Sequence, residues 1–287
     1  MIKEQEYIKS PLNYTGGKYK ILDSILEYFP DDINTFIDLF GGGFNVGINI
    51  DAKKIIYNDH ISYLKEMFQF FRETEIDYIL ENIRCRISEF NLDEQNVDGY
   101  LKLRQNFNER KNILDLFLLT CYSFNHQIRF NNKHEFNCPF GRNRSSYNSS
   151  IEQNLILFIE RLKNKNIEFS AKDFLYIKNY KFNKNDFVYC DPPYLISNAS
   201  YNDGKRGFKN WTEKEDIQLL NLLDYLNQKN IKFLLSNVTV HKGLENSRLI
   251  DWSKKYNIRY IDKNYKNCNY QLKEKNNKTQ EVVIYNY

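Results

Sequence analysis

The residues best suited to chemistry are four consecutive ones, Asp191-Pro192-Pro193-Tyr194. Two successive prolines fix the backbone and remove two N–H donors, so the Asp191 carboxylate and the Pro192 carbonyl remain as acceptors. The run DFVYC that precedes Asp191 predicts a buried strand, with the motif at its carboxyl end. A flat ring with an exocyclic amine would find two acceptors there and a stacking surface on Tyr194. The alternative is a proline-rich turn that only terminates the strand.

A second group of residues surrounds the glycines of DLFGGGFNVG. The apolar run from Thr35 to Leu39 predicts a buried parallel strand, and a second helical pattern follows the glycines. Glycines let the backbone approach a ligand closely, and Asp38 before them favours a cationic or zwitterionic ligand over a pyrophosphate. Asp59 follows a second strand at 54–57, where nucleotide-binding folds carry a carboxylate for ribose hydroxyls. A structural turn with a helix-capping aspartate is the alternative.

The elements that must position these residues alternate along the chain. Apolar residues at helical spacing predict helices within 10–29, 60–120, 151–162 and 213–228. Thr212 is the predicted cap of the last of these, with Glu215 as its capping-box partner. Apolar runs predict further strands at 167–174, ending at Asp173-Phe174, at 231–237, and as an antiparallel pair at 258–265 and 281–287. This alternation predicts an α/β fold built on a mixed sheet.

The segment 125–148 differs from its surroundings because it is polar, aromatic and basic. It contains Pro139 and Gly141 and has no helical period, so we expect structured loops. Its basic side chains outnumber a single acidic residue. Taken alone, this pattern is typical of a solvated basic face, and a local nucleic-acid surface is the alternative. Changes of character near residues 60 and 150 bracket an inserted domain.

The composition excludes several classes of protein. The chain has 287 residues, a formal net charge of +4 and 16% aromatic residues, so it is neither an acidic tail protein nor a histone-like polycation. Its five cysteines form no CxxC pair, which disfavours a zinc ribbon or a thioredoxin-type site. The N-terminus has no apolar signal-peptide core, and no apolar run approaches the roughly 18 residues of a membrane span. We therefore expect a cytoplasmic protein that does not bind membranes.

Taken together, the motifs resemble the Dam-type adenine-N6 DNA methyltransferases (D12 class, alpha group) of bacteria and phages. The resemblance rests on DLFGGG, Asn58-Asp59, DPPY and NYTGGK (13–18), and it extends to FNCPFG (136–141), Ile128-Arg129 and FLLSNVTVHKG (233–243). It covers nearly the whole chain. It implies a Rossmann-like, mixed seven-stranded catalytic domain of an S-adenosylmethionine-dependent methyltransferase at 1–63 and 151–287. A mainly helical target-recognition domain is implied at 64–150.

The resemblance also implies the cofactor S-adenosylmethionine and no metal. It places the methionine end at Asp38 and the glycine turn, the ribose at Asp59 and the adenine at Asp173 and Phe174. The implied cofactor-binding residues are Tyr14, Lys18, Asp38, Phe40, Gly41, Gly43, Asp59, Asp173, Phe174 and Asp191.

The implied reaction is methylation of an adenine that has been flipped out of duplex DNA. Tyr194 would stack on the ring, and Asp191 and Pro192 would accept from its amine and stabilise the positive charge that develops there. The implied catalytic residues are the four of the motif, Asp191, Pro192, Pro193 and Tyr194. Direct transfer needs no covalent intermediate, and one flipped base needs one site, so we expect a monomer.

The resemblance assigns recognition of duplex DNA mainly to the inserted domain that contains the loop segment 125–148. Arg129 matches the base-reading arginine of the family, a role that suits bidentate contact with guanine. The implied DNA-binding residues are Asn125, Arg129, Asn131, Pro139, Arg142 and Arg144. The family's commonest target is GATC, but Asn143 stands where relatives often carry a basic or aromatic residue. A companion restriction endonuclease acting on the same site is a further implied partner.

Other functions stay open at this point. The same motif serves cytosine-N4 methylation, because both substrates are exocyclic amines. RNA or protein-amide methylation is a weaker alternative, and a catalytically silent DNA-binding module is one of a different class. The presence of all three of Asp38, Asp59 and Asp191 favours an active enzyme.

Overall fold

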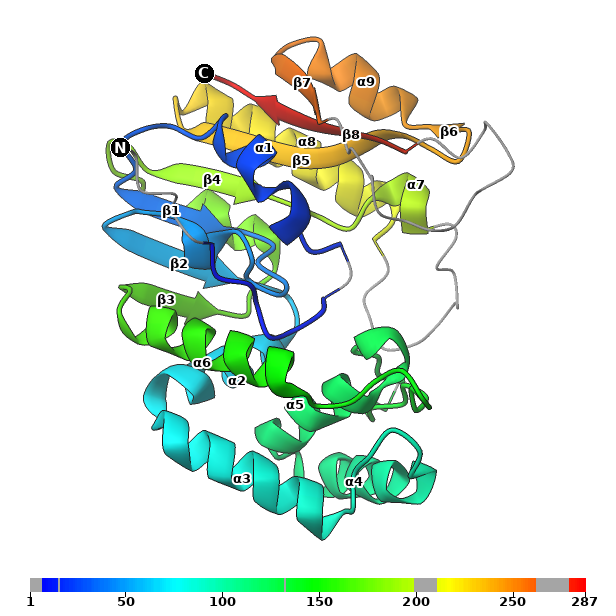
Figure 1. Cartoon of the computed structure of the whole chain (residues 1–287). Helices are drawn as coiled ribbons and strands as arrows, with labels where there is room; N and C mark the ends of the chain where they lie inside the picture. Colours follow the sequence, from blue (N-terminus) through cyan, green and yellow to red (C-terminus); the bar gives the residue numbers. More distant parts are fainter. Residues whose placement is uncertain (1–6, 15, 132, 199–210, 262–278) are drawn as a thin grey trace.

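A mixed sheet forms the centre of the computed structural model, which describes residues 7–14, 16–131, 133–198, 211–261 and 279–287 (Figure 1). The strand order is β3-β2-β1-β4-β5-β8-β7, and β6 pairs with β5 outside this path. The strands are β1 (Thr35–Asp38), β2 (Lys54–Asn58), β3 (Ile167–Ser170), β4 (Phe187–Cys190), β5 (Lys232–His241), β6 (Leu244–Glu245), β7 (Asn257–Ile261) and β8 (Thr279–Tyr285). Strands β1 to β5 pair in parallel, and β8 runs antiparallel to both β5 and β7. The predicted mixed α/β sheet is confirmed, with β6 as an additional short strand. Residues 262–265 of the predicted strand 258–265 lie outside the described part of the chain.

Helices follow in the order of the predicted pattern. The α-helices are α1 (Leu22–Leu26), α2 (Ser62–Glu73), α3 (Ile76–Glu89), α4 (Val97–Arg110), α5 (Ile113–Tyr122), α6 (Ser149–Lys163), α7 (Leu195–Asn198), α8 (Glu213–Gln228) and α9 (Ser247–Ser253). The 3-10 helices are η1 (Tyr19–Ile21), η2 (Gly47–Asn49), η3 (Phe124–His126) and η4 (Phe174–Asn179). In the described part of the chain, no helix combines the length and apolar character needed to cross a membrane.

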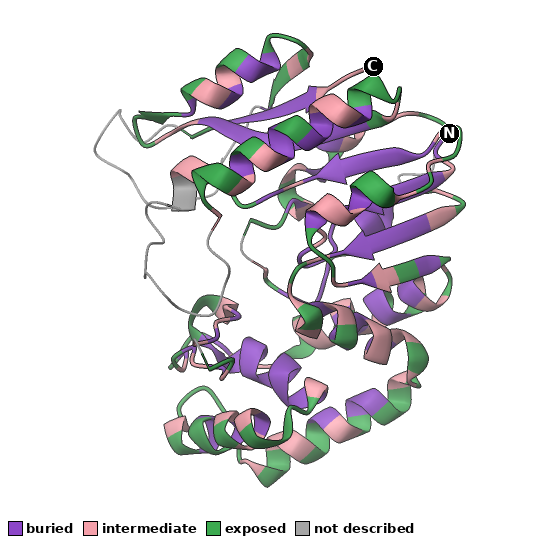
Figure 2. Cartoon of the chain, turned by 180° about the vertical axis from the view of Figure 1, so that it is seen from behind, coloured by how far each residue is buried: buried purple, intermediate pink, exposed green. Residues whose placement is uncertain are grey.

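Successive strand residues point to opposite sides of the sheet, and helices cover both sides, so the sheet is buried on both faces. In β1, Phe36 belongs to the core on one face and Ile37 to the core on the other, and both are fully buried. Helices α1, α2 and α6 cover the first face, and η4, α8 and α9 cover the second. Figure 2 shows the strands as a buried layer between helices whose outer sides are exposed. This three-layer packing leaves the ends of the strands as the place for a site.

Helices α3, α4 and α5 lie beyond the β3 edge of the sheet (Figure 1). The apolar helix α5 is buried over nearly its whole length, and Phe71 of α2 meets Phe117 of α5 with ring centroids 5.4 Å apart. One core therefore continues from the sheet into these helices. The following loops carry two isolated bridges, Ser123 to Phe140 and Phe130 to Phe136. The predictions of helices over 60–120 and of structured loops over 125–148 are confirmed.

The predicted strand 167–174 is too long at its carboxyl end. Strand β3 stops at Ser170, because the Asn58 side chain accepts from the Ser170 hydroxyl and from the Lys172 N–H and diverts the backbone from the ladder. Asp173 begins η4 instead, where its carboxylate accepts from the Leu175 N–H at 3.0 Å.

The helix predicted after the glycines is also wrong, since only the 3-10 turn η2 forms there. Asparagine side chains that compete for backbone groups disfavour a regular helix. Asn49 binds both backbone groups of Ile8, with the Ile8 N–H donating at 2.7 Å, and Asn45 accepts from the Ser10 N–H at 3.0 Å. These bonds instead fasten the N-terminal segment to the glycine turn.

The start of α8 yields a stability prediction. Thr212 accepts from the Lys214 N–H at 3.2 Å, and Glu215 accepts from the Thr212 N–H at 3.0 Å, which confirms the predicted capping box. We expect Thr212→Ala to lower the free energy of unfolding in urea by about 1 kcal/mol, the usual cost of losing such a cap. Lys214→Ala is the control, because that exposed side chain takes no part in the cap. Equal stability of Thr212→Ala and wild type would contradict this.

Candidate active site

Three acidic residues meet at one edge of the sheet because their strands are neighbours. Strand β1 pairs in parallel with β2 on one side and with β4 on the other. Parallel strands end at the same edge, so Asp38 at the end of β1, Asp59 after β2 and Asp191 after β4 converge. The chain order reverses between β1 and β4, and open α/β sheets bind ligands at such a switch point.

Asp38 is a buried carboxyl group that faces the other acids. Its Oδ2 accepts from the Gly47 N–H at 3.2 Å. Burial, followed by the charge of Asp191, raises the pKa of Asp38 to about 8. A cation placed beside such a carboxyl group favours its ionised form. The position therefore suits a ligand that carries an ammonium group.

The glycine turn packs too closely for larger residues. A Cβ atom on Gly41 would lie 2.3 Å from the Tyr57 ring, and one on Gly42 would lie 3.0 Å from the ring of Tyr14. Asp59 Oδ2 accepts from the Gly42 N–H at 2.9 Å and so fastens the turn to the end of β2. Burial raises the pKa of Asp59. Tyr14, the turn and Asp59 thus form one packed unit beside Asp38.

An aromatic cluster begins with Phe40, two residues after Asp38. The rings of Phe40, Phe174 and Trp211 contact one another with centroids 5.5 to 5.6 Å apart. Asp173 is exposed next to Phe174. Flat aromatic surfaces beside carboxylates are suited to a nucleoside-like ligand.

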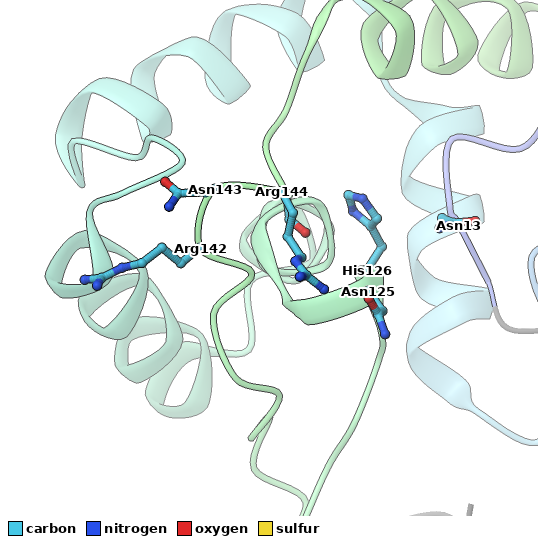
Figure 3. A pocket seen from close by; sticks show the side chains of 7 residues that line it. Asn13, Asn125, His126, Arg142, Asn143 and Arg144 are labelled. Atoms are coloured by element: carbon cyan, nitrogen blue, oxygen red, sulfur yellow. The ribbon is translucent and has the colours of Figure 1, made fainter. Parts of the chain in front are cut away.

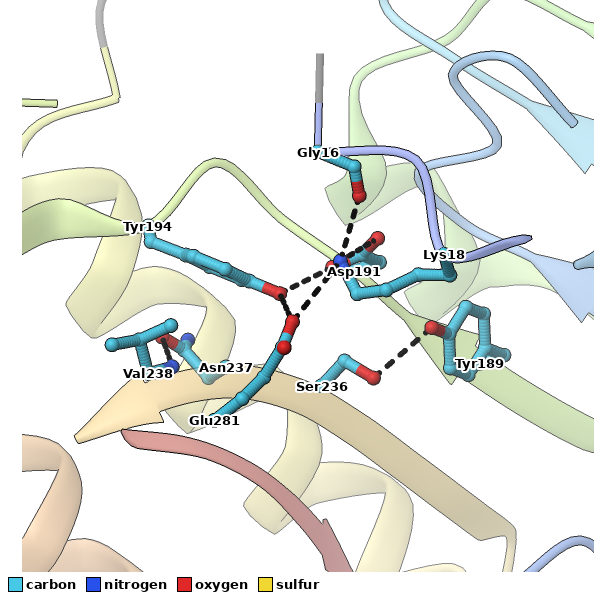
Figure 4. A network of polar contacts seen from close by, with 9 residues as sticks. All are labelled: Gly16, Lys18, Tyr189, Asp191, Tyr194, Ser236, Asn237, Val238 and Glu281. Carbon is cyan, nitrogen blue, oxygen red and sulfur yellow. Dashed lines mark hydrogen bonds and ion pairs between the residues drawn. The ribbon is translucent and has the colours of Figure 1, made fainter. Parts of the chain in front are cut away.

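The DPPY motif belongs to a buried polar network (Figure 4). The Lys18 ammonium lies 2.6 Å from Asp191 Oδ2 and 3.0 Å from the Gly16 carbonyl oxygen, and it is also 3.8 Å from Glu281 Oε1. The Tyr194 hydroxyl lies 3.0 Å from Asp191 Oδ1 and 3.3 Å from Glu281 Oε1. Lys18 Nζ also sits 5.0 Å from the centroid of the Tyr194 ring. The DPPY motif is therefore held by the N-terminal segment and by β8.

The charges in this network act on one another. Burial raises the pKa of Asp191, while the charge and hydrogen bond of Lys18 and the hydrogen bond of Tyr194 lower it. Burial, then the charges of Asp191 and Glu281, raise the pKa of Tyr194 well above its usual value. Lys18 and Tyr194 thus favour an ionised Asp191, the form that can accept hydrogen bonds from an amine.

A polar pocket of about 690 Å³ lies where the loop segment faces the N-terminal segment (Figure 3). Its lining residues are Asn13, Asn125, His126, Arg142, Asn143, Arg144 and Ser145. Asn125, His126 and Asn143 have φ between 53° and 57°, so the loops are tightly turned. The Arg144 guanidinium lies 5.0 Å from the centroid of the Phe124 ring. The pocket combines arginine and amide donors in a way that suits phosphates and base edges.

The other residues predicted to bind DNA lie outside the lining of this pocket. Arg129 donates from Nε to Asn137 Oδ1 at 3.1 Å and from a terminal nitrogen to the Asn137 carbonyl at 2.8 Å. Asn131 donates to Glu135 at 2.7 Å within the same hairpin, which is closed by the bridge between Phe130 and Phe136, and Pro139 is exposed beyond it. The structure thus brings Asn125, Arg142 and Arg144 together, whereas Arg129 is engaged with its own hairpin.

Sequence reasoning missed several residues that the structure places at these sites. Glu281 joins the DPPY network, Trp211 joins the aromatic cluster, and Asn13 and His126 line the pocket. A signal for Glu281 existed: it is the acidic residue that opens the apolar run EVVIY of a buried strand. No comparable pattern marks Asn13 or His126.

The chain is similar in sequence to known DNA methyltransferases. A family model described as "D12 class N6 adenine-specific DNA methyltransferase" matches residues 14–280. The type II methyltransferase M.FokI of Planomicrobium okeanokoites is 48% identical over 99% of this chain, which covers 44% of that protein. The modification methylase StsI of Streptococcus sanguinis is 47% identical, again over 99% of this chain and 43% of that protein. The DNA adenine methylase of Escherichia coli is 28% identical over 79% of each chain.

The chain belongs to the D12 class N6 adenine-specific DNA methyltransferase family, as its motifs indicate. It spans less than half the length of the first two relatives.

The raised pKa of Asp38 predicts how stability depends on pH. In the ligand-free protein the folded state keeps a proton that the unfolded carboxyl group has released, so Asp38 lowers the free energy of unfolding as pH rises from about 5 to 8. The effect is at most about 1.4 kcal/mol per pH unit. Urea unfolding across this range should show a smaller decline for Asp38→Asn than for wild type. Asp251→Asn, at an exposed position, is the control. Identical declines for Asp38→Asn and wild type would refute the assignment.

Proposed function

We propose that this chain is an S-adenosylmethionine-dependent DNA methyltransferase that methylates N6 of an adenine flipped out of duplex DNA. The observation that carries this proposal is the placement of Asp38 and Asp191 at the ends of the paired strands β1 and β4. A carboxylate that suits an ammonium group then stands beside an acceptor that suits a target amine. Family membership supports the choice of adenine.

The residues around Asp38 fit the proposed cofactor, which when bound supplies a methyl group activated by a sulfonium. Asp38 would accept from its ammonium group, with the turn 41–43 close to the methionine end. Asp59 would accept from ribose hydroxyls, and Phe40 and Phe174 would contact the adenine beside Asp173. Tyr14 and Lys18 would close this side of the site. The raised pKa values of Asp38 and Asp59 support the fit, since buried carboxyl groups gain from a cationic ligand.

The DPPY residues would bind the target base. Asp191 and the Pro192 carbonyl would accept from the N6 hydrogens, which stabilises the positive charge that develops on the nitrogen. Pro193 keeps the backbone rigid, and Tyr194 would stack on the ring. Because Lys18 lies over the Tyr194 ring, we assign stacking to the face of the ring opposite Lys18. Holding the amine in near-attack geometry would supply much of the rate acceleration.

We assign duplex DNA to the loop segment, with the target-recognition domain at 64–150 between the catalytic parts 1–63 and 151–287. The pocket residues Asn125, Arg142 and Arg144 are the proposed contacts to phosphates and bases. Arg129 and Asn131 of the hairpin, and Pro139 just beyond it, would also contact DNA. GATC is the first recognition site to examine. We further propose a monomeric, cytoplasmic enzyme that protects DNA from a companion restriction endonuclease, in line with the modification methylases among its relatives.

Replacement of Asp191 tests the proposed reaction. We expect Asp191→Ala to reduce tritium transfer from labelled cofactor to unmethylated duplex DNA by several orders of magnitude, because the amine loses its acceptor. Asp251→Ala is the control. It replaces an exposed aspartate distant in sequence from the motif, and this variant should transfer the methyl group at the normal rate. Circular dichroism would verify that both variants fold. Near-normal turnover by Asp191→Ala would overturn the role given to the motif.

The arginines of the pocket yield a prediction on DNA binding. If Arg142 and Arg144 contact phosphates, each alanine variant should reduce the slope of log affinity against log salt by about 1. Fluorescence anisotropy with a labelled duplex at several salt concentrations measures this slope. Lys254→Ala is the matched control, since this exposed residue carries the same charge far from the loop segment in the sequence. An unchanged slope with relaxed sequence specificity would instead make the arginine a base-reading residue.

A further inference from the structure

The Asp191 carboxylate is already engaged on both of its oxygens. Oδ2 lies 2.6 Å from the Lys18 ammonium, and Oδ1 accepts from the Tyr194 hydroxyl at 3.0 Å. The proposed target amine needs one of these oxygens as its acceptor. Each oxygen has a second lone pair and can accept from the amine as well, but a donor that moves away leaves that oxygen to the amine alone.

The Tyr194 hydroxyl is the donor that can transfer its hydrogen bond to another acceptor. A tyrosine hydroxyl has one hydrogen, so it can donate to only one carboxylate at a time. Glu281 Oε1 lies 3.3 Å from the Tyr194 hydroxyl, close enough to take this hydrogen bond with a small movement of the side chain. Lys18, by contrast, is held by the Gly16 carbonyl as well as by Asp191.

The surroundings of Glu281 explain why it would accept a hydrogen bond from the Tyr194 hydroxyl. Glu281 lies on β8 opposite Val238 of β5 and Ile261 of β7, and its side chain is only 4% exposed. A buried carboxylate is costly unless hydrogen bonds or charges compensate it. The Lys18 ammonium lies 3.8 Å from Glu281 Oε1 but only 2.6 Å from Asp191 Oδ2, so its charge compensates both carboxylates at once. An additional donor such as the Tyr194 hydroxyl therefore stabilises Glu281.

We propose that Glu281 is a positioning residue that takes over the Tyr194 hydroxyl when the target amine binds, and so leaves Asp191 Oδ1 as an unshared acceptor for that amine. This inference rests on the proposed methyl transfer. One hydrogen bond is exchanged for another of the same kind, so the exchange needs no proton transfer.

The test is a double-mutant cycle between Glu281 and Tyr194, measured as single-turnover methyl transfer to duplex DNA. Glu281→Leu keeps the side-chain size and removes the acceptor, so we expect a tenfold to hundredfold slower transfer at unchanged cofactor affinity. Glu281→Gln keeps an acceptor oxygen and should restore most of the rate. Tyr194→Phe keeps the ring and removes the competing hydroxyl. In that background Glu281→Leu should slow transfer by less than twofold.

Each other outcome is decisive. If Glu281→Leu slows transfer by the same factor in both backgrounds, Glu281 acts on something other than the Tyr194 hydroxyl. If Glu281→Leu has no effect, or if Tyr194→Phe alone abolishes transfer, the exchange is refuted while the methyltransferase activity stands. A wild-type chain that binds cofactor but transfers no label would refute the proposed function and this inference with it.

Discussion

Charge compensation at one edge of the sheet constrains the whole site. Strand order brings the carboxyl groups of Asp38, Asp59 and Asp191 together, and β8 adds Glu281. Among the described residues near them, Lys18 supplies the buried ammonium that pairs with two of these carboxylates. Burial accordingly raises the pKa of each of the three aspartates. A site of this kind gains free energy from ligands that bring positive charge, as both the proposed cofactor and a reacting amine do.

A short N-terminal segment connects the polar pocket, the glycine turn and the DPPY network. Asn13 lines the polar pocket, Tyr14 packs on the glycine turn, and Lys18 holds Asp191. Hydrogen bonds from Asn45 and Asn49 fasten the chain just before Asn13 to the same turn. The proposed DNA contacts in the pocket therefore lie within a few residues, along the chain, of the groups proposed to hold cofactor and target.

Sequence could predict the parts of the site that depend on strand ends. Asp38, Asp59 and Asp191 each follow an apolar run, and parallel strands must place such positions at a common edge. Prediction from sequence failed where hydrogen bonds of single side chains determine the backbone conformation. Asn58 ends β3 early, and Asn49 helps to replace a helix by η2. Glu281 was missed because its place depends on β8 inserting between β5 and β7. The hydrogen bonds of Arg129 with its own hairpin likewise follow from loop packing rather than from any pattern.

The most direct measurement is the identity of the methylated nucleoside. The chain would be incubated with S-adenosylmethionine and unmethylated duplex DNA, and the digested DNA would be analysed by mass spectrometry. The account predicts N6-methyladenine, located by sequencing at one short fixed site. N4-methylcytosine as the sole product would contradict the choice of base. Bound cofactor without any methylated nucleoside would contradict the account of the site as a DNA methyltransferase centre.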